Sequence, residues 1–68
     1  MVKKFIELLD GNGTAIDLIE CDNRMSFERC LERVAYEQRN NKRVQFMQLL
    51  TGKTSRMAKP IFSPKRIN

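Results

Sequence analysis

The tetrapeptide Asp10-Gly11-Asn12-Gly13 constrains the fold of this chain more than any other part of its sequence. Asparagine tolerates a positive φ and glycine favours it, so Asn12-Gly13 is typical of the point where a β-hairpin reverses direction. Large apolar side chains are frequent in the flanking residues 2–9 and 15–20. We therefore expect a hairpin with its tip at residues 10–13.

A three-residue loop over residues 11–13 would fix the register of this hairpin. Leu8 then faces Ile16 on one side of the ribbon, where the neighbouring pairs are also compatible. On the other side Glu7 faces Asp17, and two like charges directly opposite each other destabilise a strand pair. This pair counts against the register.

The same segment has a competing interpretation as two short helices over residues 2–22. A helical stripe also fits the apolar residues Val2, Phe5, Ile6 and Leu9. Gly11 would then end the first helix, and Thr14 would cap the second. The hairpin is the preferred interpretation.

A clear helix signal begins at Ser26. Serine is a good N-cap, and Glu28 places a negative charge in the first turn. Apolar residues then recur at helical spacing: Phe27, Cys30, Leu31, Val34 and Ala35. The sequence predicts an amphipathic helix over residues 27–39 that ends near Asn40-Asn41.

The remaining segments complete an α+β fold. Residues 44–50 read as a third strand, with a helix as the alternative, and residues 57–62 as a short fourth strand that Pro60 confines to a sheet edge. The predicted fold is ββαβ, with a possible extra edge strand: a small antiparallel sheet packed against one amphipathic helix, followed by a basic C-terminal tail.

The charge is unevenly divided along the chain. Residues 1–50 carry eight basic and eight acidic side chains, so the net charge of +5 comes from residues 51–68, which contain no acid. A chain of 68 residues has room for one modest core. We expect a compact domain over 1–50 and a basic tail or edge segment over 51–68.

The residue inventory argues against catalysis, metals and cofactors. The chain has no histidine, and its two cysteines, Cys21 and Cys30, have no zinc-ligand spacing, so we expect no metal site, no cofactor and two reduced thiols. Gly52-Lys53-Thr54 lacks the glycine that a phosphate-binding P-loop requires at position 47. Without a histidine to act as a base, an enzyme is not expected.

Two sets of residues are candidates for binding. A protein partner is expected to contact the outer face of the helix and the apolar residues of the tail: Arg29, Arg33, Tyr36, Ile61 and Phe62. The alternative is that the basic residues of the tail follow a DNA or RNA backbone: Lys53, Arg56, Lys59, Lys65 and Arg66. The neutral body favours the protein partner, because dedicated nucleic-acid domains also carry basic charge on their folded part.

These observations together predict a small cytoplasmic binding protein. We expect a regulator or inhibitor that occupies a functional surface of a larger protein or nucleoprotein complex, with nucleic-acid binding as the alternative. Its size and lack of catalytic groups suit a phage accessory protein, and a homo-oligomer is compatible with the sequence. The short mixed stretch after Met-Val-Lys-Lys fits neither a signal peptide nor a membrane span.

Overall fold

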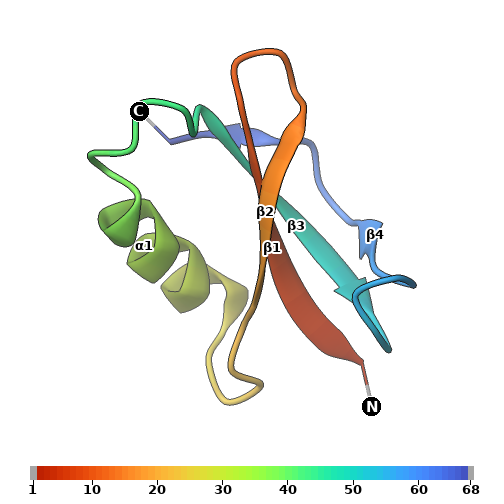
Figure 1. Cartoon of the computed structure of the whole chain (residues 1–68). Helices are drawn as coiled ribbons and strands as arrows, with labels where there is room; N and C mark the ends of the chain where they lie inside the picture. The colour runs from red at the N-terminus through yellow and green to blue at the C-terminus, as the bar shows by residue number, and fades with distance from the viewer. Residues whose placement is uncertain (1, 68) are drawn as a thin grey trace.

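A computed structural model describes residues 2–67 and contains one antiparallel sheet and one helix (Figure 1). The helix α1 (Phe27–Glu37) lies between the second and third strands in the chain. The strands are β1 (Lys3–Leu9), β2 (Ala15–Glu20), β3 (Phe46–Gly52), β4 (Lys59–Pro60) and β5 (Lys65–Arg66). They are arranged in the order β2-β1-β3-β4, and β5 also pairs with β3. The predicted α+β fold with a single helix is confirmed.

Residues 2–22 form the hairpin and not the two helices. The Asp10 carboxylate accepts hydrogen bonds from the backbone N–H groups of Asn12 and Thr14, both at 2.9 Å, and so organises the turn. Gly13 has a φ of 82°, the positive value for which glycine is suited. The turn chemistry of the sequence therefore determines this element.

The register expected for the hairpin is wrong beyond the first pair. Leu9 pairs with Ala15 as expected, but Leu8 pairs with Asp17, so Ile16 is an extra residue on β2 and forms a β-bulge. The bulge shifts all later pairs by one residue. Glu7 now lies opposite Leu18 instead of Asp17, and the two carboxylates no longer face each other.

Helix α1 begins where the sequence predicts and ends two residues earlier. The Ser26 hydroxyl accepts a hydrogen bond from the backbone N–H of Arg29 at 3.3 Å, which caps the first turn. The helix stops at Glu37, and Gln38 is its C-cap. Arg33 and Glu37 form an i, i+4 ion pair at 3.4 Å on its exposed surface.

The hydrophobic core lies between α1 and one face of the sheet. Its buried members come from the sheet, from the helix and from the segment that leads into β3: Ile6, Leu8, Cys21, Cys30, Val34, Val44, Met47 and Leu49. Val44 is buried just before β3, which is a strand and not a helix. Phe5, Leu9 and Leu50 are also buried, but they alternate with the core residues and belong to the other face of the sheet.

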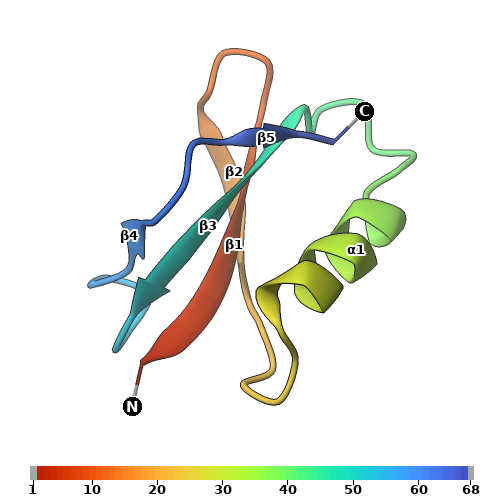
Figure 2. The same cartoon turned by 180° about the vertical axis from the view of Figure 1, so that it is seen from behind.

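Residues 53–67 lie along the free edge of β3. Pro60 pairs with Leu50 and Lys65 pairs with Met47, so the segment runs antiparallel to β3 in two short pieces (Figure 2). The N–H groups of Ile61 and Ile67 donate to Leu49 and Gln45 at 3.1 and 3.0 Å. The predicted edge strand at Pro60 is confirmed. Strand β5 was not predicted.

Because Ile6 lies in the core, we expect its truncation to destabilise the fold strongly. Its side chain is fully buried on the central strand, so Ile6→Ala should lower the free energy of unfolding by about 2–5 kcal/mol. The same substitution at Ile61, which is 42% exposed, should change it by less than about 0.5 kcal/mol. Urea unfolding followed by circular dichroism measures both. Equal losses at the two positions would contradict this assignment of the core.

Candidate binding surfaces

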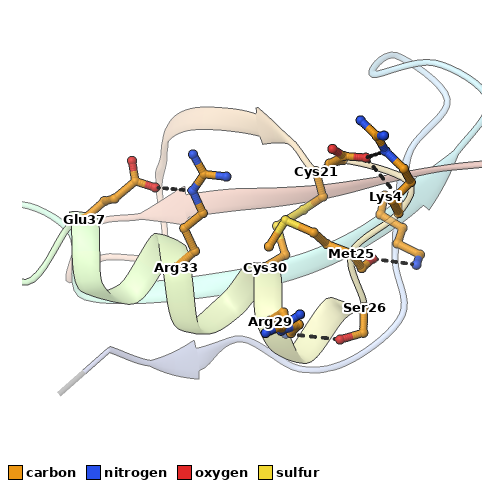
Figure 3. The surroundings of a disulfide bond; sticks show 10 residues. Lys4, Cys21, Met25, Ser26, Arg29, Cys30, Arg33 and Glu37 are labelled. Atoms are coloured by element: carbon orange, nitrogen blue, oxygen red, sulfur yellow. Dashed lines mark hydrogen bonds and ion pairs between the residues drawn. A yellow bond between two sulfur atoms is a disulfide. The ribbon is translucent and has the colours of Figure 1, made fainter.

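The two cysteines form a disulfide, so the expectation of two reduced thiols is wrong. The bond joins Cys21, directly after β2, to Cys30 in α1, with 6.2 Å between their Cα atoms (Figure 3). The helical phase buries Cys30 on the side of α1 that faces the sheet, and the strand ends with Cys21 turned towards the same core. The apolar spacing of the predicted helix accounts for the burial of Cys30, but its pairing with Cys21 was not predicted.

A groove lies along the disulfide, between β2 and α1. It has a volume of about 300 Å³ and is lined on the strand side by Ile19, Glu20 and Cys21. The helix side is lined by Cys30, Val34 and Glu37. The floor is therefore apolar and the rim is charged. Of the residues selected from the sequence, only Arg33 lines this groove, where its guanidinium is paired with Glu37.

The outer face of α1 presents Tyr36 as expected. The Tyr36 side chain is 66% exposed. One face of its ring is covered by the Arg39 guanidinium, 3.8 Å from the ring centroid, and this guanidinium also donates to the Tyr36 carbonyl oxygen at 2.6 Å. Arg29 is exposed on the same face of the helix. This surface is available to a partner, but part of the ring is already stacked.

Ile61 and Phe62 directly follow β4 in the chain. β4 is the terminal strand remote from β2, and it lies on the opposite side of the molecule from α1 (Figure 1). Phe62 is 59% exposed, and Met57 is equally exposed in the turn before β4. The partner-binding residues predicted from the sequence therefore form two separate surfaces instead of one.

The basic residues of the C-terminal segment are all exposed and are spread along the edge of β3. Lys59 pairs with Thr51 at one end of β3, and Lys65 pairs with Met47 near the other. The two positions are four residues apart along β3, or about 13 Å at 3.3 Å per residue. Arg66 lies with its guanidinium 5.5 Å from the centre of the Phe46 ring. Lys53 and Arg56 lie in the turn between β3 and β4.

Sequence reasoning missed the close approach that holds this edge in place. A Cβ atom built on Gly52 would lie 2.6 Å from the Ala58 Cα, so only glycine allows the turn over 53–58 to fold back on β3. The signal was present, because Gly52 follows a predicted strand and precedes a second run of apolar residues. Gly52 was considered as part of an incomplete P-loop pattern and not as a point of close contact.

The described residues contain neither a group of His, Cys, Asp and Glu side chains that could hold a metal ion nor a helix long and apolar enough to cross a membrane. Comparison with protein-family models, with curated proteins and with solved structures finds no match to this chain. The case for a function rests on the two surfaces and the groove.

The disulfide should contribute measurably to stability. It closes a loop with a sequence separation of nine residues, for which the chain-entropy model gives about 2–3 kcal/mol. We expect reduction, or the double substitution of Cys21 and Cys30 by alanine, to lower the urea midpoint accordingly. Mass spectrometry of the alkylated but unreduced chain should show no free thiol. Full alkylation, with an unchanged midpoint under reductant, would contradict the bond.

Gly52→Ala should detach the edge segment without unfolding the core. The added methyl group collides with backbone at Ala58, so the turn must move at a cost of about 1–3 kcal/mol. Amide exchange at Ile61 should accelerate, because its hydrogen bond to Leu49 depends on that turn, while exchange at Ile6 stays slow. Gly11→Ala is the control, since its nearest contact is an ordinary 3.6 Å to Gln45. Unchanged exchange at Ile61 in the Gly52 variant would contradict the close approach.

Proposed function

We propose that this chain is a small non-enzymatic binding protein that acts as a regulator or inhibitor on a functional surface of a larger protein or nucleoprotein complex. The supporting observation is the row of exposed apolar side chains in residues 57–62. Met57, Ile61 and Phe62 are solvent-exposed. The backbone of this segment is nevertheless held in place, because the Ile61 N–H donates to the Leu49 carbonyl on β3 and the Met57 N–H donates to the Thr54 carbonyl within the turn. Exposed apolar groups on an ordered segment are typical of protein interfaces.

The ordered backbone makes this edge a better anchor than a flexible tail. A segment that is already fixed loses less conformational entropy on binding than one that must be ordered by its partner. An aromatic residue such as Phe62 can then enter a pocket on the partner, and the bases around it can form a charged rim. This arrangement suits an acidic or mixed protein surface.

A non-enzymatic role is consistent with the chemistry present. Both sulfur atoms are bonded to each other, so neither thiol is a nucleophile in this state. No histidine is available to act as a base. A phage accessory protein that blocks a host machine would need only such a binding surface, and we retain that as part of the proposal.

The cytoplasmic location expected from the sequence remains a prediction. The Cys21–Cys30 bond weighs against it, because disulfides persist mainly in oxidising compartments and are rare in the cytosol. Measuring the thiol state of the chain immediately after acid quenching of its source cells would decide between a reducing and an oxidising location.

One observation favours nucleic-acid binding as the second candidate. Lys42 and Arg43 precede β3 at the end where Lys65 and Arg66 pair with it, so the basic edge is extended by residues of the folded body. The neutral charge of residues 1–50 as a whole disfavours nucleic-acid binding, but this end of the folded body carries basic side chains of its own. Exposed bases strung along an edge can follow a phosphate backbone.

Two multiple variants separate these candidates. The first replaces the basic residues of the C-terminal segment by glutamine: Lys53, Arg56, Lys59, Lys65 and Arg66. The second is Ile61→Ala with Phe62→Ala. We expect capture of the partner from nuclease-treated lysate of the source cells to be lost in the double alanine variant and kept in the glutamine variant, because apolar anchors carry most of an interface's energy. Tyr36→Ala tests the helix surface separately.

The opposite pattern would overturn the protein-binding proposal. Nucleic-acid binding predicts that a DNA duplex binds the chain with a log–log salt slope of about −4, at −0.9 for each of four or five phosphate contacts. The glutamine variant would then lose binding, and the double alanine variant would keep it. Fluorescence anisotropy over a range of salt concentrations measures the slope directly.

A further inference from the structure

The outer side of β2 is an open sheet edge. β2 is the terminal strand in the order β2-β1-β3-β4, and among residues 2–67 no strand pairs with its other side. Cys21 donates its N–H to the Lys4 carbonyl on β1 at 2.9 Å. Since hydrogen-bonding direction alternates along an antiparallel strand, the N–H and C=O groups of Leu18 and Glu20 point away from β1.

The side chain of Asp17 occupies one of the hydrogen-bonding groups of this edge. Its carboxylate accepts a hydrogen bond from the Leu18 N–H at 2.8 Å. The oxygen therefore occupies the position that a carbonyl oxygen of an added strand would take. Acidic side chains at an edge are a common protection against unwanted pairing, and they also restrict which strands can pair.

The groove lies directly beside these edge groups. Ile19 and Glu20 of β2 line one side of it, and Val34 of α1 lines the other. A strand added to β2 would direct every second side chain towards α1 and thus into this groove. The Cys21–Cys30 bond forms part of the apolar floor that such a side chain would contact.

We propose that the groove between β2 and α1 binds an extended, basic peptide segment of another protein, which adds to β2 as an antiparallel strand. In this arrangement alternate side chains differ in their surroundings. Small apolar residues enter the groove beside Ile19 and Val34. The residues between them, which hydrogen-bond to Leu18 and Glu20, point to the other face of the sheet.

The charge of β2 determines the class of partner. Residues 15–22 contain Asp17, Glu20 and Asp22 and no base. Glu20 lines the groove, but its pairing with Phe5 places its side chain on the face of the sheet away from α1. Its carboxylate is 3.9 Å from the Lys3 ammonium group in an exposed ion pair, and a lysine of the added strand would stand directly opposite it. A second copy of this chain would instead bring acidic strands together, so pairing of β2 with itself is disfavoured.

The probe peptide is acetyl-Lys-Val-Lys-Val-Lys-Val-Lys-amide, added to the isotope-labelled oxidised chain. We expect the amide signals of Leu18 and Glu20 and the methyl signals of Ile19 and Val34 to shift. Backbone N-methylation of the lysines should weaken binding about tenfold, because two hydrogen bonds to β2 are lost. Methylation of the valines, whose N–H groups point away from β2, should leave it nearly unchanged. The protein is identical in both titrations.

Protein variants test the same geometry from the other side. Leu18→Pro places a pyrrolidine ring on the open edge at a position whose N–H bonds to Asp17 and not to β1, so the hairpin keeps its bonds while the ring blocks the added strand. Glu20→Gln should weaken the lysine peptide about twofold to threefold, and Glu32→Gln, an exposed carboxylate on α1 outside the groove, should not. A peptide with glutamate in place of lysine should bind more weakly than the lysine peptide.

Several outcomes would overturn the proposal. Equal binding of the two methylated peptides, shifts confined to other residues, or no shift at millimolar peptide would each do so. A dimer that forms through β2 and is abolished by Leu18→Pro would also overturn it, in favour of self-association. Substitution of Ile61 and Phe62 should not affect this groove, because they lie at the opposite edge of the sheet, so this proposal fails or stands independently of the proposed function.

Discussion

The pairing of β1 with a strand on each side is the constraint on which the rest of this structure depends. β1 is apolar on both faces, with Ile6 and Leu8 towards the helix and Phe5 and Leu9 towards the other side, so it can only be a central strand. With β2 fixed beside it by a tight turn, β3 must take the remaining side. The connection from β2 to β3 therefore has to pass over one face of the sheet, and α1 covers that face as it does so.

Because of this topology, the basic and acidic segments of the sequence lie at opposite edges of the sheet. The segment without acids lies along β3 at one edge of the sheet, while the acidic residues of β2 lie at the other. The two edges therefore differ in the sign of their charged side chains. The two edges also differ in how their backbone groups are satisfied. The edge of β3 is covered by the chain's own C-terminal segment. The edge of β2 keeps its backbone groups accessible, except for the Leu18 N–H, which donates to the Asp17 carboxylate.

Elements with strong local signals could be predicted from the sequence, and those fixed by tertiary contacts could not. Ser26 and the apolar spacing after it predict the helix, and Asn12-Gly13 predicts the hairpin. The bulge at Ile16 was missed because it depends on which residues of β1 and β2 lie opposite each other. The like charges of Glu7 and Asp17 in the expected register had already indicated that this register was unfavourable. The disulfide was missed because no periodicity relates residue 21 of a strand to residue 30 of a helix. The groove depends on that bond, and so it was missed as well.

The loop enclosed by the disulfide has a consequence for proteolysis. Arg24 lies between the two cysteines, and its side chain is 92% exposed, so a trypsin-like protease can reach the bond that follows it. A cut there leaves one fragment with the hairpin and another with the helix and the rest of the sheet, and the Cys21–Cys30 bond holds them together. The nicked protein would migrate as an intact chain until a reductant separates the two pieces.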